Sequence, residues 1–477
     1  MLELKGISLS YEKVCILSGI NAEFKHGEVN VITGNSGCGK SSLIKLINGI
    51  VPYIDKAEVS GDIILEGISL QDKNIVDRSR HISSVFQNPK TQFYALDTTD
   101  EMAFALENRG VFKEEIFNKI MFYSGLLGTR NLMGRNIFRL SGGEKQMVAI
   151  TAVSCMEQQV YLFDEPSSSL DIKAMENLKE AILKLKELDK IIIIAEHRLS
   201  YLRNIIDNLF IIKDGNMVKF ESGGINDDIC AEYGLRMLKK VKKEELSKES
   251  TSVADLFANE SKNISAGYDK NLCNDTDVLY CRDFKYRYGD HEVFNFDIYF
   301  KKGVHFIIGS NGVGKTSFIR CLCGLSRGFK GKIYYGRHRV RRPPDIISLV
   351  MQDVNYQLFT ESVWDEISIV SDDDVKKESI LKDFGLSDKK DLHPQSLSGG
   401  EKQRLAIALC AASKKPVVIL DEPTSGLCRN SMYKTADFIN AMRDDGKTVI
   451  VISHDYEFIK YCRGNIVEFK GRETKAL

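Results

Sequence analysis

The stretch GNSGCGKS, residues 34–41, decides the fold of this chain. It matches the pattern G-x-x-x-x-G-K-[ST], in which backbone N–H groups at the start of a helix surround a phosphate. The apolar run VNVITG leads into it and predicts a buried strand, and SSLIKLINGI follows and predicts a helix. Glycine is needed because the backbone must turn tightly and lie close to the phosphate oxygens. The stretch therefore predicts a phosphate site between a strand and a helix.

The same pattern returns as GSNGVGKT at 309–316, and other segments return with it. LSGGEKQ occurs at 140–146 and at 397–403, and VYLFDEPSSSLD at 160–171 returns as VVILDEPTSGLC at 417–428. Ser141 to Glu165 spans 24 residues, as does Ser398 to Glu422. The chain is therefore an internal repeat of two similar halves.

The spacing between two earlier motifs differs between the halves. Lys40 to Gln87 spans 47 residues, whereas Lys315 to Gln352 spans 37. We interpret this as a loss of surface elements from the second half.

Length and composition limit the classes of protein that fit. A chain of 477 residues predicts two or more domains. Lys plus Arg and Asp plus Glu are 66 each, and this zero net charge gives no support for nonspecific nucleic-acid binding. No run approaches the ~18 apolar residues of a membrane span, and the N-terminus does not read as a secretory signal. The 11 cysteines lack paired spacings, which is typical of a reducing cytosol.

A change of composition separates the halves. KKVKKEELSKESTS begins as a charge run that predicts a solvated helix, and NESKNISAGYDKNLCNDTD is polar and rich in turn formers. We predict a first domain at 1–225, a linker at 226–275 and a second domain at 276–477. Apolar runs with β-branched residues in each domain predict central strands of a parallel sheet with crossover helices.

Acidic pairs follow two of these predicted strands, in YLFDE and VVILDE. A strand end presents both carboxylates at the carboxyl edge of the sheet, where ligands bind in α/β folds. We expect Asp164 and Asp421 to hold Mg²⁺, together with the hydroxyls of Ser41 and Thr316. We expect Glu165 and Glu422 to act as general bases on the attacking water.

One histidine in each half follows another apolar strand. His197 lies 32 residues after Glu165, and His454 lies 32 residues after Glu422. A neutral imidazole at this place could donate a hydrogen bond to a γ-phosphate. The competing interpretation is a histidine that merely ends a strand, but the shared offset favours a shared role.

Taken together, LSGGE and the two phosphate loops resemble the ATP-binding cassette (ABC) ATPases, duplicated in one chain. The resemblance implies an α/β fold of two RecA-like P-loop ABC ATPase domains, each with an antiparallel β subdomain and a helical subdomain. It also implies an intramolecular pseudo-dimer, in which the LSGGE loop of one half closes over the ATP held by the other half. The signature residues are then Ser141, Gly142 and Gly143 for the ATP on Lys315, and Ser398, Gly399 and Gly400 for the ATP on Lys40.

The resemblance assigns further residues to ATP and Mg²⁺. Tyr11 and Tyr288 stand where the family has an aromatic that stacks on adenine, although Tyr286 and core packing compete with this role. Gln87 and Gln352 match the Q-loop, which touches Mg²⁺ and water and couples to a membrane partner. The phosphate-loop residues assigned to ATP are Gly34, Asn35, Ser36, Gly37, Cys38, Gly39, Lys40, Ser41 and Ser42, and Gly309, Ser310, Asn311, Gly312, Val313, Gly314, Lys315, Thr316 and Ser317.

The residues after the Q-loop indicate a class within the family. FQNPKTQFYALDTTDEMAFALEN resembles the ATPases of energy-coupling factor (ECF) transporters, and MQDVNYQLFTESVWDEI keeps its Gln-Leu-Phe portion. The resemblance implies a cytoplasmic ATPase at the inner face of the cell membrane. A membrane scaffold subunit and a substrate-binding membrane subunit would act in trans to import a vitamin, vitamin precursor or metal ion, with no direct contact with nucleic acid.

Three other classes with two cassettes fit less well. Duplicated sugar-importer ATPases usually lack the second phosphate-loop lysine, and Lys315 is present. ABC proteins that act on ribosomes carry a longer, highly charged helical linker and lack this Q-loop. DNA-repair ABC proteins carry zinc-binding cysteine clusters. A non-transport ATPase acting on ribosomes or nucleic acid stays as the alternative.

Two positions depart from the family pattern. The aspartate expected after Leu427 is Cys428, whereas the first half has Asp171. Met147 stands where the family usually has a basic residue, as Arg404 is in the second half. We expect the helix that carries Met147 to form and one ionic contact to be lost. We also expect the two ATP sites not to be equivalent.

Overall fold

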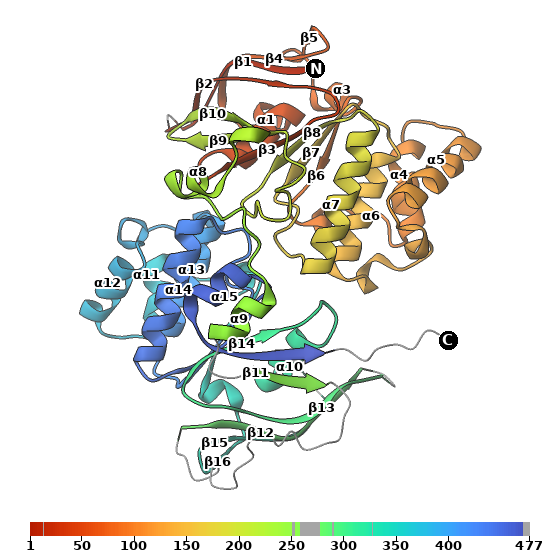
Figure 1. Cartoon of the computed structure of the whole chain (residues 1–477). Coiled ribbons are helices and arrows are strands. Elements are labelled where there is room, and N and C mark those ends of the chain that lie inside the picture. The colour runs from red at the N-terminus through yellow and green to blue at the C-terminus, as the bar shows by residue number, and fades with distance from the viewer. Residues whose placement is uncertain (13, 250–252, 258–276, 289–290, 327, 471–477) are drawn as a thin grey trace. The chain divides into compact units, whose positions relative to one another are not determined.

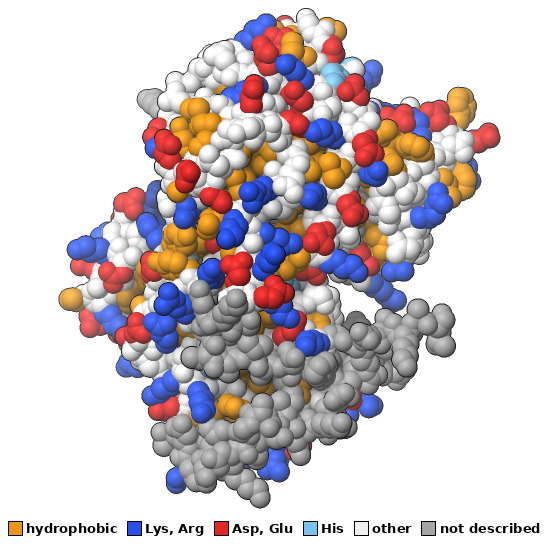
Figure 2. Space-filling model, in the orientation of Figure 1, with side chains coloured by type: hydrophobic (Ala, Val, Ile, Leu, Met, Phe, Trp, Pro, Cys, Tyr) orange, Lys and Arg blue, Asp and Glu red, His pale blue; other side chains and the backbone are white. Residues whose placement is uncertain are grey.

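The computed structural model describes residues 1–12, 14–249, 253–257, 277–288, 291–326 and 328–470 (Figure 1). The chain divides into two compact units, one of Met1–Lys240 with Cys428–Asn430 and one of Val241–Leu427 with Ser431–Leu477. Within the described residues, no helix has the length and apolar character needed to cross a lipid bilayer. On the face shown in Figure 2, basic and acidic side chains are interspersed.

The central sheet of the first unit is mostly parallel, with strand order β10-β9-β3-β8-β7-β6. Only β10 runs antiparallel to its neighbour, β9. Every residue of β3 and of β8 is buried, which explains their uninterrupted apolar sequences. The strands are β3 (Val29–Gly34), β6 (Ile82–Val85), β7 (Val160–Asp164), β8 (Ile191–Ala195), β9 (Asn208–Lys213) and β10 (Asn216–Glu221).

An antiparallel sheet of order β2-β1-β4-β5 covers the first helix of this unit. Its strands are β1 (Leu2–Tyr11), β2 (Val14–Phe24), β4 (Glu58–Leu65) and β5 (Ile68–Ser69). Alternate side chains of β1, among them Leu2 and Leu4, enter one core with Leu43 and Ile47 of α1. The predicted antiparallel β subdomain is thus present in the first half.

The helices of the first unit are α1 (Lys40–Asn48), α2 (Ile50–Tyr53), α3 (Ile75–Arg78), α4 (Thr98–Glu107), α5 (Lys113–Leu126), α6 (Gly142–Ser154), α7 (Ile172–Glu187) and α8 (Asp227–Glu232). Helices α4, α5 and α6 share a separate core that includes Met102, Ile120 and Val148. This group is the predicted helical subdomain.

The second unit repeats the plan. Its parallel sheet has the order β11-β20-β14-β19-β18-β17, and its antiparallel sheet has the order β13-β12-β15-β16. The strands are β11 (Val253–Phe257), β12 (Leu279–Tyr288), β13 (His291–Phe300), β14 (Gly303–Ile308), β15 (Lys330–Tyr335), β16 (His338–Val340), β17 (Ile347–Val350), β18 (Val417–Asp421), β19 (Thr448–Ile452) and β20 (Asn465–Lys470). The helices are α9 (Lys243–Glu249), α10 (Lys315–Leu322), α11 (Val363–Ser368), α12 (Asp374–Asp383), α13 (Gly399–Ala412), α14 (Arg429–Asp444) and α15 (Tyr456–Cys462).

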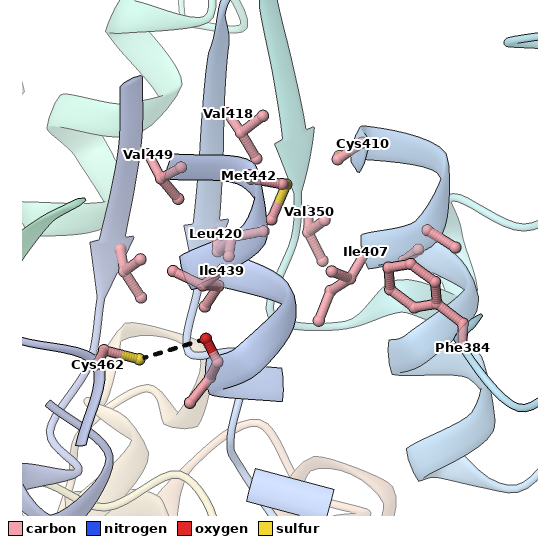
Figure 3. Close-up of a cluster of buried hydrophobic side chains, with 14 of the residues drawn as sticks. Val350, Phe384, Ile407, Cys410, Val418, Leu420, Ile439, Met442, Val449 and Cys462 are labelled. Atoms are coloured by element: carbon pink, nitrogen blue, oxygen red, sulfur yellow. Dashed lines mark hydrogen bonds between the residues drawn. The ribbon is translucent and has the colours of Figure 1, made fainter. Parts of the chain in front are cut away.

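The largest core of the second unit lies between its parallel sheet and its helices. Figure 3 shows Ile407 of α13 and Ile439 and Met442 of α14 gathered against side chains of the sheet. These sheet residues are Val350, Val418, Leu420 and Val449. Burial of this apolar surface fixes the strand ends that carry the acidic pair and the histidine.

The longer segment of the first half includes one buried charged side chain. Helix α3 ends in Arg78, which is 5% exposed and donates to the carbonyl oxygens of Leu46 at 2.8 Å and Leu70 at 2.7 Å. Leu46 lies in the last turn of α1, so the guanidinium caps the helix that begins at the phosphate loop. The loss of surface elements from the second half stays an interpretation.

The predicted linker contains ordered elements. Cys230, Leu235 and Leu238 are buried in the first unit, and Lys243 of α9 forms an ion pair with Glu468 of β20 at 2.6 Å. Strand β11 pairs in parallel with β20. The two units divide between Lys240 and Val241, inside the predicted linker 226–275. Residues 258–276, which carry its polar part, lie outside the described residues.

Candidate ATP-binding and hydrolysis sites

Both phosphate loops bend in the way that the pattern requires. Gly39 and Gly314 precede α1 and α10 with φ of 103° and 102°, a left-handed conformation that favours glycine. A Cβ at Gly39 would lie 2.8 Å from Cγ2 of Ile16, and a Cβ at Gly314 would lie 2.7 Å from Cγ1 of Val293. Glycine is therefore required at both positions by conformation and by space.

The loop lysines point into their own loops. Lys40 is 5% exposed, and its Nζ donates to the carbonyl oxygens of Gly34 at 3.4 Å and Asn35 at 3.3 Å. Lys315 donates to Gly309 at 2.6 Å and to Ser310 at 2.8 Å. An ammonium held in this way lies at the centre of the loop, where phosphate oxygens would bind.

The residues assigned to Mg²⁺ lie together in each half. The hydroxyl of Ser41 donates to Oδ1 of Asp164 at 2.8 Å, and Thr316 donates to Asp421. Burial raises the pKa of Asp164 and raises the pKa of Asp421 to about 6. A buried carboxylate beside a hydroxyl is costly without a cation, and both groups are hard oxygen ligands. The residues present therefore fit Mg²⁺.

The predicted general bases occupy strained backbone positions. Glu165 and Glu422 have φ of 44° and 51°, which is uncommon for residues other than glycine. Their N–H groups donate to Ala195 at 2.8 Å and to Ile452 at 2.9 Å, so each is tied to the neighbouring strand. Such strain costs on the order of 1–3 kcal/mol and clusters at functional sites.

The carboxylate of Glu165 is held from a second side by the Q-loop. Nε2 of Gln87 donates to Oε2 of Glu165 at 2.9 Å. Burial raises the pKa of Glu165 to about 8; Glu196 and Asp164 also raise it, whereas Lys40 lowers it. The side chain of Gln352 forms no such bond with the residues that the structure describes in the second half.

The histidines lie beside these carboxylates. Nε2 of His197 is 3.5 Å from Oε1 of Glu165, and Nε2 of His454 is 3.5 Å from Oε1 of Glu422. His197 Nε2 is also 3.0 Å from Nζ of Lys40, and since an ammonium only donates, this nitrogen accepts. Burial and the charge of Lys40 hold the pKa of His197 well below its usual range, so the ring is neutral.

Each signature loop begins a helix with reciprocal capping. Ser141 and Glu144 form a capping box at α6, and Ser398 and Glu401 form one at α13. The N–H groups of the first helical turn have no partner within a helix, which leaves those of the glycines available to an anion. Gly143 has a second reason to be glycine, because its Cβ would lie 2.6 Å from that of Ala174.

The predicted adenine-stacking residues end corresponding strands. Tyr11 ends β1 and is half-buried against the core of the first unit. Tyr288 ends β12, and its side chain lies outside the described residues. Tyr286 packs on Phe294 with ring centroids 5.9 Å apart, so it belongs to the core. Adenine stacking on Tyr11 and Tyr288 stays a prediction.

Sequence reasoning missed three buried glutamates near these sites: Glu101, Glu196 and Glu366. Glu196 directly follows the apolar run IIIIA, where the second half has Ser453. The signal in the sequence was an acidic residue next to a segment that predicts burial. A buried carboxylate needs hydrogen-bond partners inside the protein.

The geometry of the two halves agrees with comparisons to known proteins. The family model described as ABC transporter matches residues 17–168 and 293–425. A Treponema denticola protein, provisionally named an ABC transporter ATP-binding protein, is 37% identical over 100% of this chain and 97% of its own length. A Clostridium perfringens protein with the same kind of name is 29% identical over 99% of this chain and 90% of its own length.

A solved structure extends the similarity to the fold. That of RNase-L Inhibitor matches with a TM-score of 0.60 over 96% of this chain and 86% of its own, at 24% identity. This likeness concerns the fold alone. The two matched ranges and the full-length relatives show that this chain is a tandem ATPase of the ABC transporter family.

Proposed function

We propose that this chain is the energising subunit of an ECF-type importer, peripheral at the inner face of the cell membrane. Membrane scaffold and substrate-binding subunits act in trans, and the cargo is a vitamin, vitamin precursor or metal ion. Two ATP sites form between the halves, each from the phosphate loop of one and the signature loop of the other. ATP draws the halves together, and hydrolysis releases them.

The residues of the first phosphate loop divide the work of hydrolysis. Lys40 and the loop N–H groups hold the β- and γ-phosphates, and Ser41 and Asp164 hold Mg²⁺, which neutralises charge on the phosphates. Glu165 takes the proton of the attacking water, and Gln87 keeps its carboxylate in place. His197 orients the γ-phosphate. In the second half, Lys315, Thr316, Asp421, Glu422 and His454 take these roles.

Support for a docked partner comes from exposed apolar side chains directly after each Q-loop. Tyr94 and Leu96 are 77% and 66% exposed, and Tyr356 and Phe359 are 83% and 76% exposed. Large apolar side chains gathered at one loop are typical of protein interaction sites. Both halves place them within ten residues of Gln87 or Gln352, so a partner there would sense the ATP site.

Buried glutamates hold these loops in place before any partner binds. Oε2 of Glu101, which is 7% exposed, accepts from the N–H groups of Tyr94 at 2.9 Å and Ala95 at 2.8 Å. Oε2 of Glu366, which is 1% exposed, accepts from those of Phe359 at 3.2 Å and Thr360 at 3.0 Å. Loops fixed in this way lose little entropy on docking.

The Gln-aromatic motif adds a second restraint to each loop. Gln92 accepts from the N–H of Phe86 at 3.3 Å, and Gln357 accepts from that of Met351 at 2.7 Å. Their amide groups also donate to strand carbonyls, of Ser84 at 3.1 Å and of Leu349 at 2.8 Å. The motif that resembles ECF ATPases therefore shapes the apolar loop that we assign to the scaffold.

Co-purification from membranes tests the proposal. The tagged full chain should retain integral membrane proteins after detergent extraction, and Tyr94→Glu with Phe359→Glu should lose them. Ile68→Glu, at a 61% exposed position of β5 outside these loops, is the matched control and should retain them. Co-sedimentation with ribosomes instead, or equal retention by both variants, would overturn the transport assignment.

A further inference from the structure

The turn that carries each histidine is held by a buried carboxylate, but the halves place this carboxylate differently. In the first half Glu196 precedes His197 and Arg198 follows it. In the second half Ser453 precedes His454 and Asp455 follows it. Glu196 and Asp455 are 2% and 5% exposed, so each needs hydrogen-bond donors inside the protein.

Glu196 satisfies its carboxylate from its own turn. Oε1 accepts from the backbone N–H of His197 at 2.7 Å and from that of Arg198 at 3.0 Å. Oε2 accepts from the hydroxyl of Tyr201 at 3.1 Å. Hydrogen bonds to an ionised acceptor are about twice as strong as neutral ones. The backbone of His197 is therefore fixed by the residue next to it.

A fixed backbone sets the position of the imidazole. Nε2 of His197 lies 3.0 Å from Nζ of Lys40 and 3.5 Å from Oε1 of Glu165. The ring thus stands between the lysine that holds phosphate and the carboxylate that activates water. Reacting groups must be placed within fractions of an ångström. A loosened turn would therefore misplace the imidazole and slow hydrolysis.

The second half uses its carboxylate to join two segments. Oδ2 of Asp455 accepts from the hydroxyl of Thr424, two residues after Glu422, at 3.1 Å. Oδ1 accepts from the N–H of Phe458 at 3.3 Å, in the first turn of α15. Ser453 accepts from the N–H of Asp455 at 3.1 Å. The histidine turn of this half is therefore tied to the segment that follows its general base.

The corresponding positions of the first half carry different residues. The residue at the position of Thr424 is Ser167, which is fully buried and lies beside the hydroxyl of Tyr201. The residue at the position of Asp455 is Arg198, and the residue at the position of Phe458 is Tyr201, which bonds to Glu196 instead. The two halves thus achieve the same placement of histidine through different bonds.

We infer that Glu196 is a positioning residue of the first ATP site, which holds the imidazole of His197 between Lys40 and Glu165. Asp455 holds that of His454 and also couples its turn to the segment after Glu422. A movement of the histidine turn therefore reaches the segment after the general base through different bonds in the two sites. This inference rests on the roles proposed above for Glu165 and His197.

Steady-state ATP hydrolysis by the full chain tests the inference. With hydrolysis at the second site blocked by Glu422→Gln, we expect Glu196→Ala to lower kcat on the order of tenfold or more while KM changes by less than about threefold, because the imidazole is misplaced but the phosphate loop is intact. If Glu196 acts through His197, adding Glu196→Ala to His197→Ala should lower kcat little further. An equal loss in both backgrounds would reduce Glu196 to a structural residue and overturn the inference.

Three further variants separate position from folding. Glu196→Ser with Arg198→Asp recreates the pattern of the second half, with Ser167 as donor, and should restore a large part of the lost kcat. Tyr201→Phe, which matches Phe458, should have a small effect. If Glu196→Ser with Arg198→Asp does not regain kcat although its melting temperature is unchanged, the inference is also overturned. Lys40→Ala tests the proposed site itself: if it leaves hydrolysis unchanged, the site is wrong whatever Glu196 does.

Discussion

At the scale of single residues, the general bases combine three unfavourable conditions. Glu165 and Glu422 have left-handed backbones, they directly follow buried strands, and each lies beside another carboxylate. The native fold tolerates this because hydrogen bonds from Glu165 to Ala195 and from Gln87 to Glu165 fix the arrangement. The acidic pair after an apolar run predicted these residues, but no sequence pattern predicted the backbone strain.

The raised pKa of Glu165 predicts a pH-dependent gain in stability for Glu165→Gln. Between pH of about 4.5 and 8, the folded protein keeps this proton, whereas the unfolded chain has released it. In wild type, the contribution of Glu165 to the free energy of unfolding is therefore full below about pH 4.5 and falls as the pH rises towards 8. Glutamine does not titrate, so the melting temperature of the variant should exceed that of wild type increasingly across this interval.

Glu114→Gln provides the control, because Glu114 is exposed on α5. A pH-dependent gain of the same size in Glu114→Gln would show that the gain is not specific to Glu165. Parallel curves for Glu165→Gln and wild type would show that the carboxyl is not held protonated in the folded protein.

At the scale of elements, Met147 and Arg404 belong to two different ways of packing the signature helix. Nε of Arg404 donates to the carbonyl oxygen of Phe384 at the end of α12, at 3.0 Å, and the ring of Phe384 stacks on Phe438 of α14 with centroids 3.7 Å apart. The corresponding residues of the first half, 257 positions earlier, are Met147, Leu127 and Ala181, all in one buried cluster. Helix α6 forms as expected, but what aliphatic packing replaces is a hydrogen bond to a backbone carbonyl and an aromatic stack, and not the expected ionic contact.

The aspartate that Cys428 replaces caps the corresponding helix of the first half. Asp171 precedes α7, and its carboxylate accepts from the N–H of Ala174 at 2.8 Å. Cys428 occupies the same place before α14, and cysteine is a poor acceptor. Cys428→Asp should therefore stabilise α14 by about 1 kcal/mol, which corresponds to roughly 2–4 °C in melting temperature.

Cys428→Ala is the comparison that isolates the cap, since alanine removes the thiol without adding an acceptor. Differential scanning calorimetry of the two variants should place the aspartate variant above the alanine variant. Equal melting temperatures would mean that the end of α14 does not need an acceptor from residue 428.

Much of the element plan could be predicted, and the gaps have physical reasons. Runs such as IIIIA and VVILD predicted buried parallel strands, because strands covered on both faces need no polar alternation. Strand β11 was missed because its pairing partner, β20, lies more than 200 residues away in the chain. Arg78 was missed because its acceptors are backbone carbonyls, and no pattern of side chains predicts a hydrogen bond to a backbone carbonyl.

At the scale of the whole molecule, duplication has kept the positions of the reacting groups and altered what supports them. The distance from histidine to general base is 3.5 Å in both halves. The contacts of the loop lysine differ. Nζ of Lys40 contacts His197 and lies 3.4 Å from the carbonyl oxygen of Gly34. Nζ of Lys315 lies closer to its loop, 2.6 Å from the carbonyl oxygen of Gly309 and 2.8 Å from that of Ser310. The hypothesis of two unequal sites therefore gains support from the surroundings of each site, independent of Cys428.

The proposed exchange of signature loops predicts which residue pairs are energetically coupled. Equilibrium ATP binding would be measured with Mg²⁺ in full-length Glu165→Gln/Glu422→Gln protein, where hydrolysis is blocked. Residues that share one ATP couple by roughly 0.5–3 kcal/mol, whereas residues on different ATP molecules are nearly additive. Lys40→Ala should thus be coupled to Ser398→Ala and additive with Ser141→Ala, and Lys315→Ala should show the reverse pattern.

Each serine variant also loses a helix cap worth about 1 kcal/mol, so Ser141→Asn and Ser398→Asn, which keep a capping side chain, accompany the cycles. Coupling that survives in the asparagine series is due to ATP and not to fraying of α6 or α13. The reverse result, with Lys40 coupled to Ser141, would mean that each half binds ATP with its own signature loop. In that case the doubling of LSGGEKQ would serve two independent ATPases, and the closing of the two halves on shared ATP could not drive transport.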